Sequence, residues 1–176
     1  MRAILASALV LACAAQAQAQ PARPRLPAAV NAYVAELNKE CRSYGGSPGS
    51  SPDLVKSADL TGDGLPDHVV SHDAYRCDGA ASAMGAGQSG AYVAIFASGP
   101  GGLATKAFGD TVYGATIETK AGRSVVLMSV AGLACGQRNA ASVPFSQIKS
   151  CDRPLAWIPA KRIFDYTPMS QMRPLR

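Results

Sequence analysis

The sequence has few of the residues and patterns on which catalysis and nucleic-acid binding most often depend. It contains two histidines and 6% aromatic residues, which leaves little basis for a Ser-His-Asp triad. Its formal net charge of +5 is small and is not gathered into basic runs with aromatics between them, so nucleic-acid binding has little support. No period of about 20–50 residues repeats, which excludes a solenoid or a complete propeller.

The N-terminus lacks an apolar run long enough to cross a bilayer and instead resembles an export signal. Arg2 is followed by the apolar segment Ile4–Ala12 and by Ala17-Gln18-Ala19, a small-x-small cleavage site. We therefore predict a signal peptide over residues 1–19 and a periplasmic or secreted mature protein without a transmembrane segment. In the alternative interpretation Val10–Cys13 is a lipobox and Cys13 becomes a lipidated N-terminus, although cleavage there would leave an unusually short signal.

No Cys-x₂-Cys pair is present, which argues against a Cys₄ metal site. Removal of the signal peptide with Cys13 would leave four of the five cysteines. An even number of cysteines in an exported chain predicts two disulfides, but four cysteines allow three pairings. We favour Cys41–Cys77 and Cys135–Cys151, because each pairing closes a loop of moderate length and the two staple the halves of the domain separately. Each is expected to stabilise the fold by about 3–4 kcal/mol in the chain-entropy model.

Residues 28–165 are predicted to form a single domain between a Pro/Arg-rich linker (20–27) and a disordered tail (166–176). Apolar residues recur at spacings of three and four over residues 28–41, which predicts an amphipathic helix. Its apolar stripe consists of Val30, Tyr33, Val34, Leu37 and Cys41.

Beyond residue 53, short apolar runs separated by Gly-rich turns predict β-strands. They are expected near residues 53–59, 67–73, 91–97, 103–108, 111–119, 123–131 and 155–165. Gly-containing segments at 98–102 and 120–123 predict hairpin turns. The expected fold is a β-dominated α+β domain: an antiparallel meander of about six or seven strands with one N-terminal helix and two disulfides.

Three aspartates lie at positions 1, 5 and 9 of the segment Asp59–Asp67, which we name the Asp loop. An oxygen-rich turn of this kind suits Ca²⁺, and we predict that the ion has a structural role. The candidate ligands are the side chains of Asp59, Thr61, Asp63 and Asp67 and the carbonyl of Leu65. An EF-hand would need a glutamate where Val70 stands. In the alternative interpretation, the carboxylates cap backbone N–H groups without any ion.

The pattern D-x-[T/N/D]-x-D-G-x-x-D, followed by a Val-rich strand, resembles the FG-GAP/VCBS-type repeats of integrin propellers and many exported bacterial proteins. The resemblance covers about residues 57–108, in which Ala91–Leu103 corresponds to the second strand and its Gly-rich turn. Two departures are an insertion over Cys77–Gly90 and the presence of Thr61, where the family usually has Asn or Asp. The resemblance implies a calcium-binding turn that pins the first hairpin.

Other residues that suggest chemistry also have a simpler explanation. His68 and His72 fall on one predicted strand, where residues four apart are separated by about 13 Å, too far to share a metal, so we interpret them as ordinary surface residues. Four aromatic side chains could line a binding groove, but alternation within strands favours a core role: Trp157, Tyr92, Tyr113 and Phe96.

These observations predict a non-enzymatic, monomeric binding protein of the bacterial cell envelope, with a protein or glycan partner. We expect the binding surface first on the loop Cys77–Gly90. One alternative is an inhibitor of an envelope hydrolase. After loss of Arg2 the chain keeps 16 basic and 12 acidic residues, and this net +4 argues against a basic target such as lysozyme. The second alternative is a hydrolase without a recognisable motif.

Overall fold

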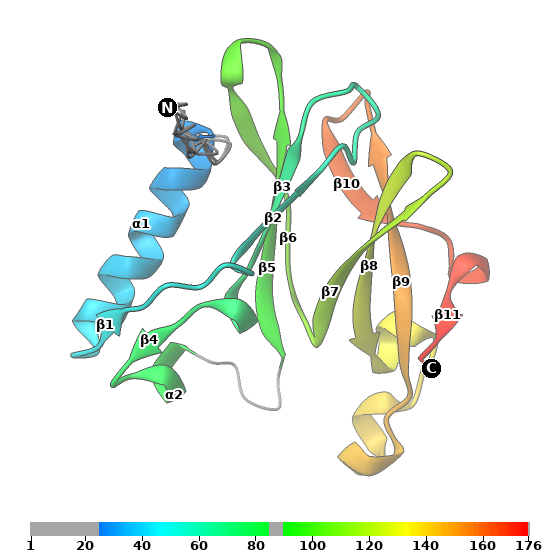
Figure 1. Cartoon of the computed structure of the whole chain (residues 1–176). Coiled ribbons are helices and arrows are strands. Elements are labelled where there is room, and N and C mark those ends of the chain that lie inside the picture. Colours follow the sequence, from blue (N-terminus) through cyan, green and yellow to red (C-terminus); the bar gives the residue numbers. More distant parts are fainter. Residues whose placement is uncertain (1–24, 85–89, 176) are drawn as a thin grey trace, which may run out of the picture.

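The computed structural model describes residues 25–84 and 90–175, which form three layers (Figure 1). The first sheet has the order β2-β3-β5-β6 and the second the order β10-β9-β8-β7, and every neighbouring pair is antiparallel. Helix α1 (Ala28–Ser43) lies against the outer face of the first sheet. The prediction of a β-dominated antiparallel fold with one main N-terminal helix is therefore confirmed.

The first four long strands along the chain form the first sheet, and the next four form the second. The first sheet contains β2 (Val55–Ala58), β3 (Asp67–Ser71), β5 (Ala91–Ser98) and β6 (Ala104–Val112). The second contains β7 (Gly114–Lys120), β8 (Arg123–Ala131), β9 (Ser150–Ile158) and β10 (Ile163–Tyr166). The short elements are β1 (Ser47–Pro48), β4 (Cys77–Asp78), α2 (Ala81–Met84) and β11 (Arg173–Pro174).

Two predicted boundaries are wrong for identifiable reasons. The segment 155–165, expected as one strand, is a hairpin: β9 begins earlier at Ser150, and the chain turns before β10 through Pro159 and Arg162, whose φ is +55°. Proline is a frequent turn residue, but the surrounding apolar residues masked that signal. The predicted break at 109–110 is absent because β6 runs on to Val112, and the chain crosses to the second sheet at Tyr113.

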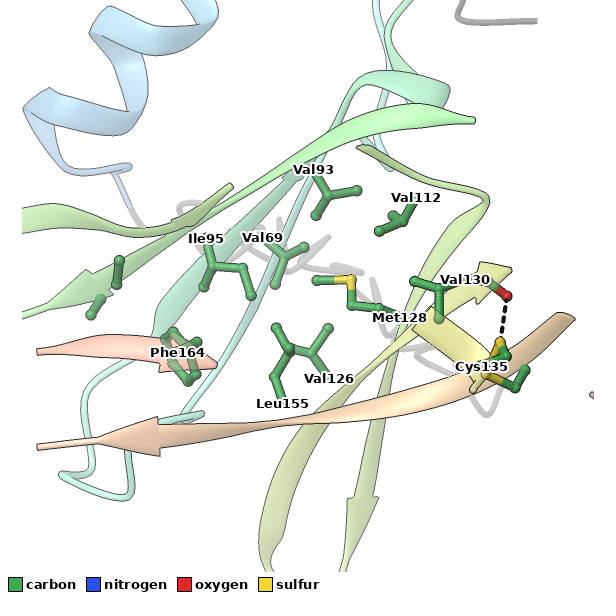
Figure 2. Close-up of a cluster of buried hydrophobic side chains, with 13 residues drawn as sticks. Val69, Val93, Ile95, Val112, Val126, Met128, Val130, Cys135, Leu155 and Phe164 are labelled. Atoms are coloured by element: carbon green, nitrogen blue, oxygen red, sulfur yellow. Dashed lines mark hydrogen bonds between the residues drawn. A yellow bond between two sulfur atoms is a disulfide. The ribbon is translucent and has the colours of Figure 1, made fainter. Parts of the chain in front are cut away.

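The main core lies between the two sheets. Val69, Val93 and Ile95 of the first sheet face Val126 and Met128 of the second (Figure 2). Strand alternation sends successive side chains to opposite faces, so the other face of the first sheet forms a second apolar cluster against α1. That cluster contains Val30, Leu37, Leu54, Val70, Ala94 and Phe96. Burial on both faces explains why β5 is almost continuously apolar.

Both predicted disulfides are present. Cys41 at the end of α1 is bonded to Cys77 of β4, and Cys135, which ends a 3₁₀ turn after β8, is bonded to Cys151 of β9. The first bond therefore ties α1 to the chain that continues the first sheet, and the second closes a loop within the second sheet. The predicted stripe of α1 is also confirmed, since Val30, Leu37 and Cys41 are buried.

Candidate functional site: a groove between the first helix and an edge strand

The Asp loop connects β2 to β3, and its last residue is its anchor. Asp67 is completely buried. Its Oδ2 accepts hydrogen bonds from the backbone N–H groups of Leu60 and Thr61, and its Oδ1 accepts one from Ser98 at 2.8 Å. Because Ser98 ends β5, Asp67 fastens the loop to the β5–β6 turn. Backbone donors of this kind can compensate a buried carboxylate for its lost hydration.

The other two carboxylates of the loop cap backbone N–H groups nearby. Asp59 accepts from Gly62 at 2.7 Å and from Gly64 at 2.9 Å, and Asp63 accepts from Leu65 at 2.9 Å. Gly62 and Gly64 have φ values of +82° and +83°, which a glycine adopts without strain. The loop is therefore closed by the amide capping that the ion-free interpretation describes.

Calcium binding by this loop stays a prediction. A carboxylate has about four lone-pair positions, of which the amides occupy three on Asp67, two on Asp59 and one on Asp63. The hydroxyl of Thr61 is buried without a hydrogen-bond partner. Oxygen ligands thus remain for a cation, but within residues 25–84 and 90–175 no three Asp, Glu, His or Cys side chains are gathered closely enough to hold one. The loop side chains would have to come closer together to bind a cation.

The interpretation of His68 as a surface residue is wrong, and His72 is only partly exposed. His68 has an exposed fraction of only 5%, and its Nδ1 is 2.8 Å from the Oγ of Ser57 on the neighbouring strand. His72 lies beyond β3 in a 3₁₀ turn, where its Nε2 is 2.9 Å from the Tyr33 hydroxyl of α1. Sequence alone did not show that α1 covers this face of the sheet.

Burial sets the ionisation of both rings. It lowers the pKa of His68 from its ordinary value, and the neighbouring Asp67 carboxylate opposes that shift without cancelling it. Burial likewise lowers the pKa of His72, with Glu40 opposing and Lys106 reinforcing the change. Both imidazoles are therefore neutral at pH 7, and each ring has one nitrogen that donates and one that accepts a hydrogen bond.

A groove of about 670 Å³ lies beside the pair formed by Ser57 and His68. Val55, Ser57 and His68 line it from β2 and β3, and its walls come from four segments: the start of α1, the chain leading into β2, the end of the Asp loop and the β5–β6 turn. We name it the α1–β2 groove. It is lined by Arg25, Leu26, Pro27, Asn31, Val34, Ser51, Pro52, Leu54, Val55, Ser57, Leu65, Pro66, His68 and residues 98–102.

The Asp loop contributes to this groove both directly, through two of its residues, and indirectly, through the anchor Asp67. Leu65 and Pro66 are part of the loop and line the groove, and Ser98, which Asp67 binds through its backbone N–H, lines it too. The Ser98 hydroxyl also donates to the carbonyl of Pro66 at 2.6 Å. The buried carboxylate therefore holds two of the four groove walls together.

A second hollow, of about 390 Å³, lies on the other side of the Asp loop. Trp157 and Phe164 line it with their rings 4.9 Å apart, and Asp59 and Arg123 add opposite charges. Trp157 and Phe96 also pack against the apolar clusters, as the sequence predicted. Tyr113, in contrast, is 47% exposed because it occupies the crossing between the sheets.

The loop at 77–90, where we expected the binding surface, falls partly outside the description: residues 85–89 are among those the structure does not describe. Its described part contains β4 and α2. The predicted signal peptide, together with the lipobox alternative at Cys13, also lies outside the described residues.

Comparison of the chain with protein-family models, with curated proteins and with solved structures finds no match. The resemblance of residues 57–108 to FG-GAP repeats accordingly stays a prediction that depends on the Asp loop and the strands that follow it. In the part of the chain that is described, none of the helices is both long and apolar enough for a membrane span.

Proposed function

We propose that this protein is an exported, disulfide-bonded binding domain of the bacterial cell envelope, periplasmic or secreted, and that its ligand occupies the α1–β2 groove. The observation that carries the proposal is the groove itself. Its volume of about 670 Å³ falls in the range of about 300–1,000 Å³ typical of ligand sites.

The lining of the groove also supports binding. Most of its side chains are apolar or small, whereas Ser57 and His68 form a hydrogen-bonded polar pair within it. A site with apolar walls and a few convergent polar groups gains affinity from the walls and specificity from the polar groups. His68 is neutral, so it can exchange one further hydrogen bond with a ligand without the cost of burying a charge.

The two disulfides support the proposed location. Bonds of this kind form and persist in oxidising compartments such as the bacterial periplasm, and the predicted signal over residues 1–19 would deliver the chain there. A structural calcium ion in the Asp loop belongs to the same proposal, because the loop forms one wall of the groove.

A fragment screen followed by NMR would test the site. In ¹⁵N-labelled mature protein, bound fragments should shift the amide signals of Val55, Ser57 and His68. The variant Leu65→Arg, which places a charge in a groove wall, should abolish these shifts. The control Leu133→Arg adds the same charge at a residue that is 68% exposed and does not line the groove. Shifts that gather elsewhere, or that survive in Leu65→Arg, would contradict the proposal.

The pair of Ser57 and His68 supports a hydrolase as a second candidate. The neutral ring could take the hydroxyl proton onto Nδ1 while Ser57 Oγ attacks the carbonyl carbon of an ester. As the carbonyl reforms, the ester C–O bond would break and the proton would pass from Nδ1 to the departing alkoxide. A fluorophosphonate probe distinguishes this function from binding. A hydrolase should be labelled at Ser57 and not in Ser57→Ala, whereas a binding domain with an ordinary hydroxyl should remain unlabelled.

A further inference from the structure

Within residues 25–84 and 90–175, strand β2 is an edge of the first sheet, and two of its residues have no ladder partner on the outer side. The N–H of Ser71 donates to the carbonyl of Leu54 at 3.0 Å, and the register pairs Lys56 with Val69. In an antiparallel ladder, backbone groups point alternately toward and away from the partner strand. The backbone N–H and C=O groups of Val55 and Ser57 therefore point away from β3, along the free edge.

The same two residues line the α1–β2 groove. Their side chains lie on the face of the sheet that α1 covers, since Val55 packs in the cluster of Val30 and Ser57 reaches His68. An extended chain placed against β2 would continue the sheet, and alternate side chains of that chain would enter the groove. The free backbone groups and the apolar α1–β2 groove are therefore both suited to an extended chain.

The charged residues near the groove indicate which kind of extended chain would bind. Arg25 is the one permanently charged residue among the described residues that line the groove. Lys56 lies on β2 between the two free-edge residues, with its side chain on the opposite face of the sheet from the groove, and its partner Asp53, at 3.8 Å, is largely exposed and leaves it weakly neutralised. A strand added to β2 would therefore meet Arg25 on its groove side and Lys56 on its other side, and carboxylates on the ligand would complement both charges.

We propose that the ligand of the α1–β2 groove is an extended acidic peptide that adds to β2 as a fifth strand of the first sheet. This inference rests on the proposed function and specifies its ligand class. Val55 and Ser57 supply the backbone hydrogen bonds, the groove takes apolar side chains at alternate positions, and Arg25 and Lys56 attract the carboxylates.

The probe is a peptide selected from a displayed random library for binding to the mature protein. Selected sequences should carry apolar residues at alternate positions and at least one acidic residue. When the best peptide is synthesised and added, hydrogen exchange at the amides of Val55 and Ser57 should slow by about tenfold or more, because these N–H groups become hydrogen-bonded. Failure to select any peptide would overturn the inference.

Two variants of one residue separate strand addition from side-chain contact. Ser57→Pro removes an outward-facing N–H that the sheet does not use, which an edge strand tolerates, and should weaken peptide binding about tenfold. Ser57→Ala loses the hydroxyl but keeps the N–H, so the further loss of affinity from Ser57→Ala to Ser57→Pro measures the contribution of the backbone N–H. Equal affinity of Ser57→Pro and Ser57→Ala would overturn the inference. If Ser57→Pro does not fold, the exchange of the two amides in the parent decides.

The outcomes also separate the inference from the proposed function. A peptide or fragment that shifts His68 and is blocked by Leu65→Arg, but leaves the Val55 and Ser57 amides unprotected, overturns strand addition and keeps the groove as a binding site. Peptide binding that Leu65→Arg does not weaken overturns both.

Discussion

At the scale of single residues, Asp67 and His68 are neighbours in β3 whose side chains point to opposite faces of the first sheet. Asp67 shares its face with Val69 of the inter-sheet core, and His68 shares its face with Val70 of the cluster under α1. One carboxylate thus fastens the Asp loop to the β5–β6 turn, while the adjacent imidazole lines the groove. Both side chains are buried polar groups, and their hydrogen-bond partners determine how much free energy their burial costs.

Removal of the Asp67 carboxylate should be strongly destabilising. Asp67→Ala leaves three backbone N–H groups without their acceptor, and we expect a loss of about 3–5 kcal/mol in the free energy of unfolding. Asp63→Ala is the matched control, because that exposed carboxylate caps one amide, and should cost about 1 kcal/mol or less. Urea denaturation of both variants measures the difference. Equal losses would mean that the anchor role of Asp67 is wrong.

The histidines should make stability depend on pH in a defined direction. The pKa values of His68 and His72 are lowered from 6.5 in the folded state, so the unfolded chain binds protons more readily. The contribution of the two histidines to stability is complete above pH 6.5. It is lost as the pH falls through the pKa values that they have in the folded state. The free energy of unfolding should therefore decrease from about pH 7.5 to about pH 5. His68→Gln should reduce this slope, and a slope that is unchanged or of opposite sign contradicts the expectation.

At the scale of elements, α1 and the paired cysteines could be predicted because each depends on a local pattern or on simple counting. The 3.6-residue stripe gave the helix, and the even number of cysteines with moderate loops gave the bonds. The burial of His68 could not be predicted, since it requires both the β2–β3 register that brings Ser57 opposite and the position of α1. The groove has the same origin, because its walls come from four separate segments.

The Asp loop yields an element-scale prediction. If Ca²⁺ binds the folded loop, an ion concentration of about 100 times Kd should stabilise the protein by about 2.7 kcal/mol, which calorimetry would detect as a higher Tm. Asp63→Ala should abolish the increment, because Asp63 has the most lone pairs left by amide capping and is a predicted ligand. Mg²⁺ serves as the control ion, since it demands a smaller octahedral site. A Tm of the parent that Ca²⁺ does not change would show that the loop is closed by amides alone.

At the scale of the whole molecule, the two disulfides stabilise different layers of the fold. Cys41–Cys77 joins the last turns of α1 to the first half of the chain, whereas Cys135–Cys151 is part of the inter-sheet core. The α1–β2 groove belongs entirely to α1, the first sheet and their connections. Loss of Cys41–Cys77 should therefore affect ligand binding as well as stability. Loss of Cys135–Cys151 should affect global stability alone.

This asymmetry can be tested with two double variants. Cys41→Ala with Cys77→Ala and Cys135→Ala with Cys151→Ala should each reduce the free energy of unfolding by about 3–4 kcal/mol, because their loops have sequence separations of 36 and 16. Amide exchange in α1 should accelerate in the first pair only, since that helix then loses its covalent tie to the chain. Fragment or peptide affinity for the groove should fall in the first pair and stay near that of the parent in the second. Equal effects on α1 exchange would mean that packing of Val30 and Leu37 against the first sheet, rather than the disulfide, holds the helix in place.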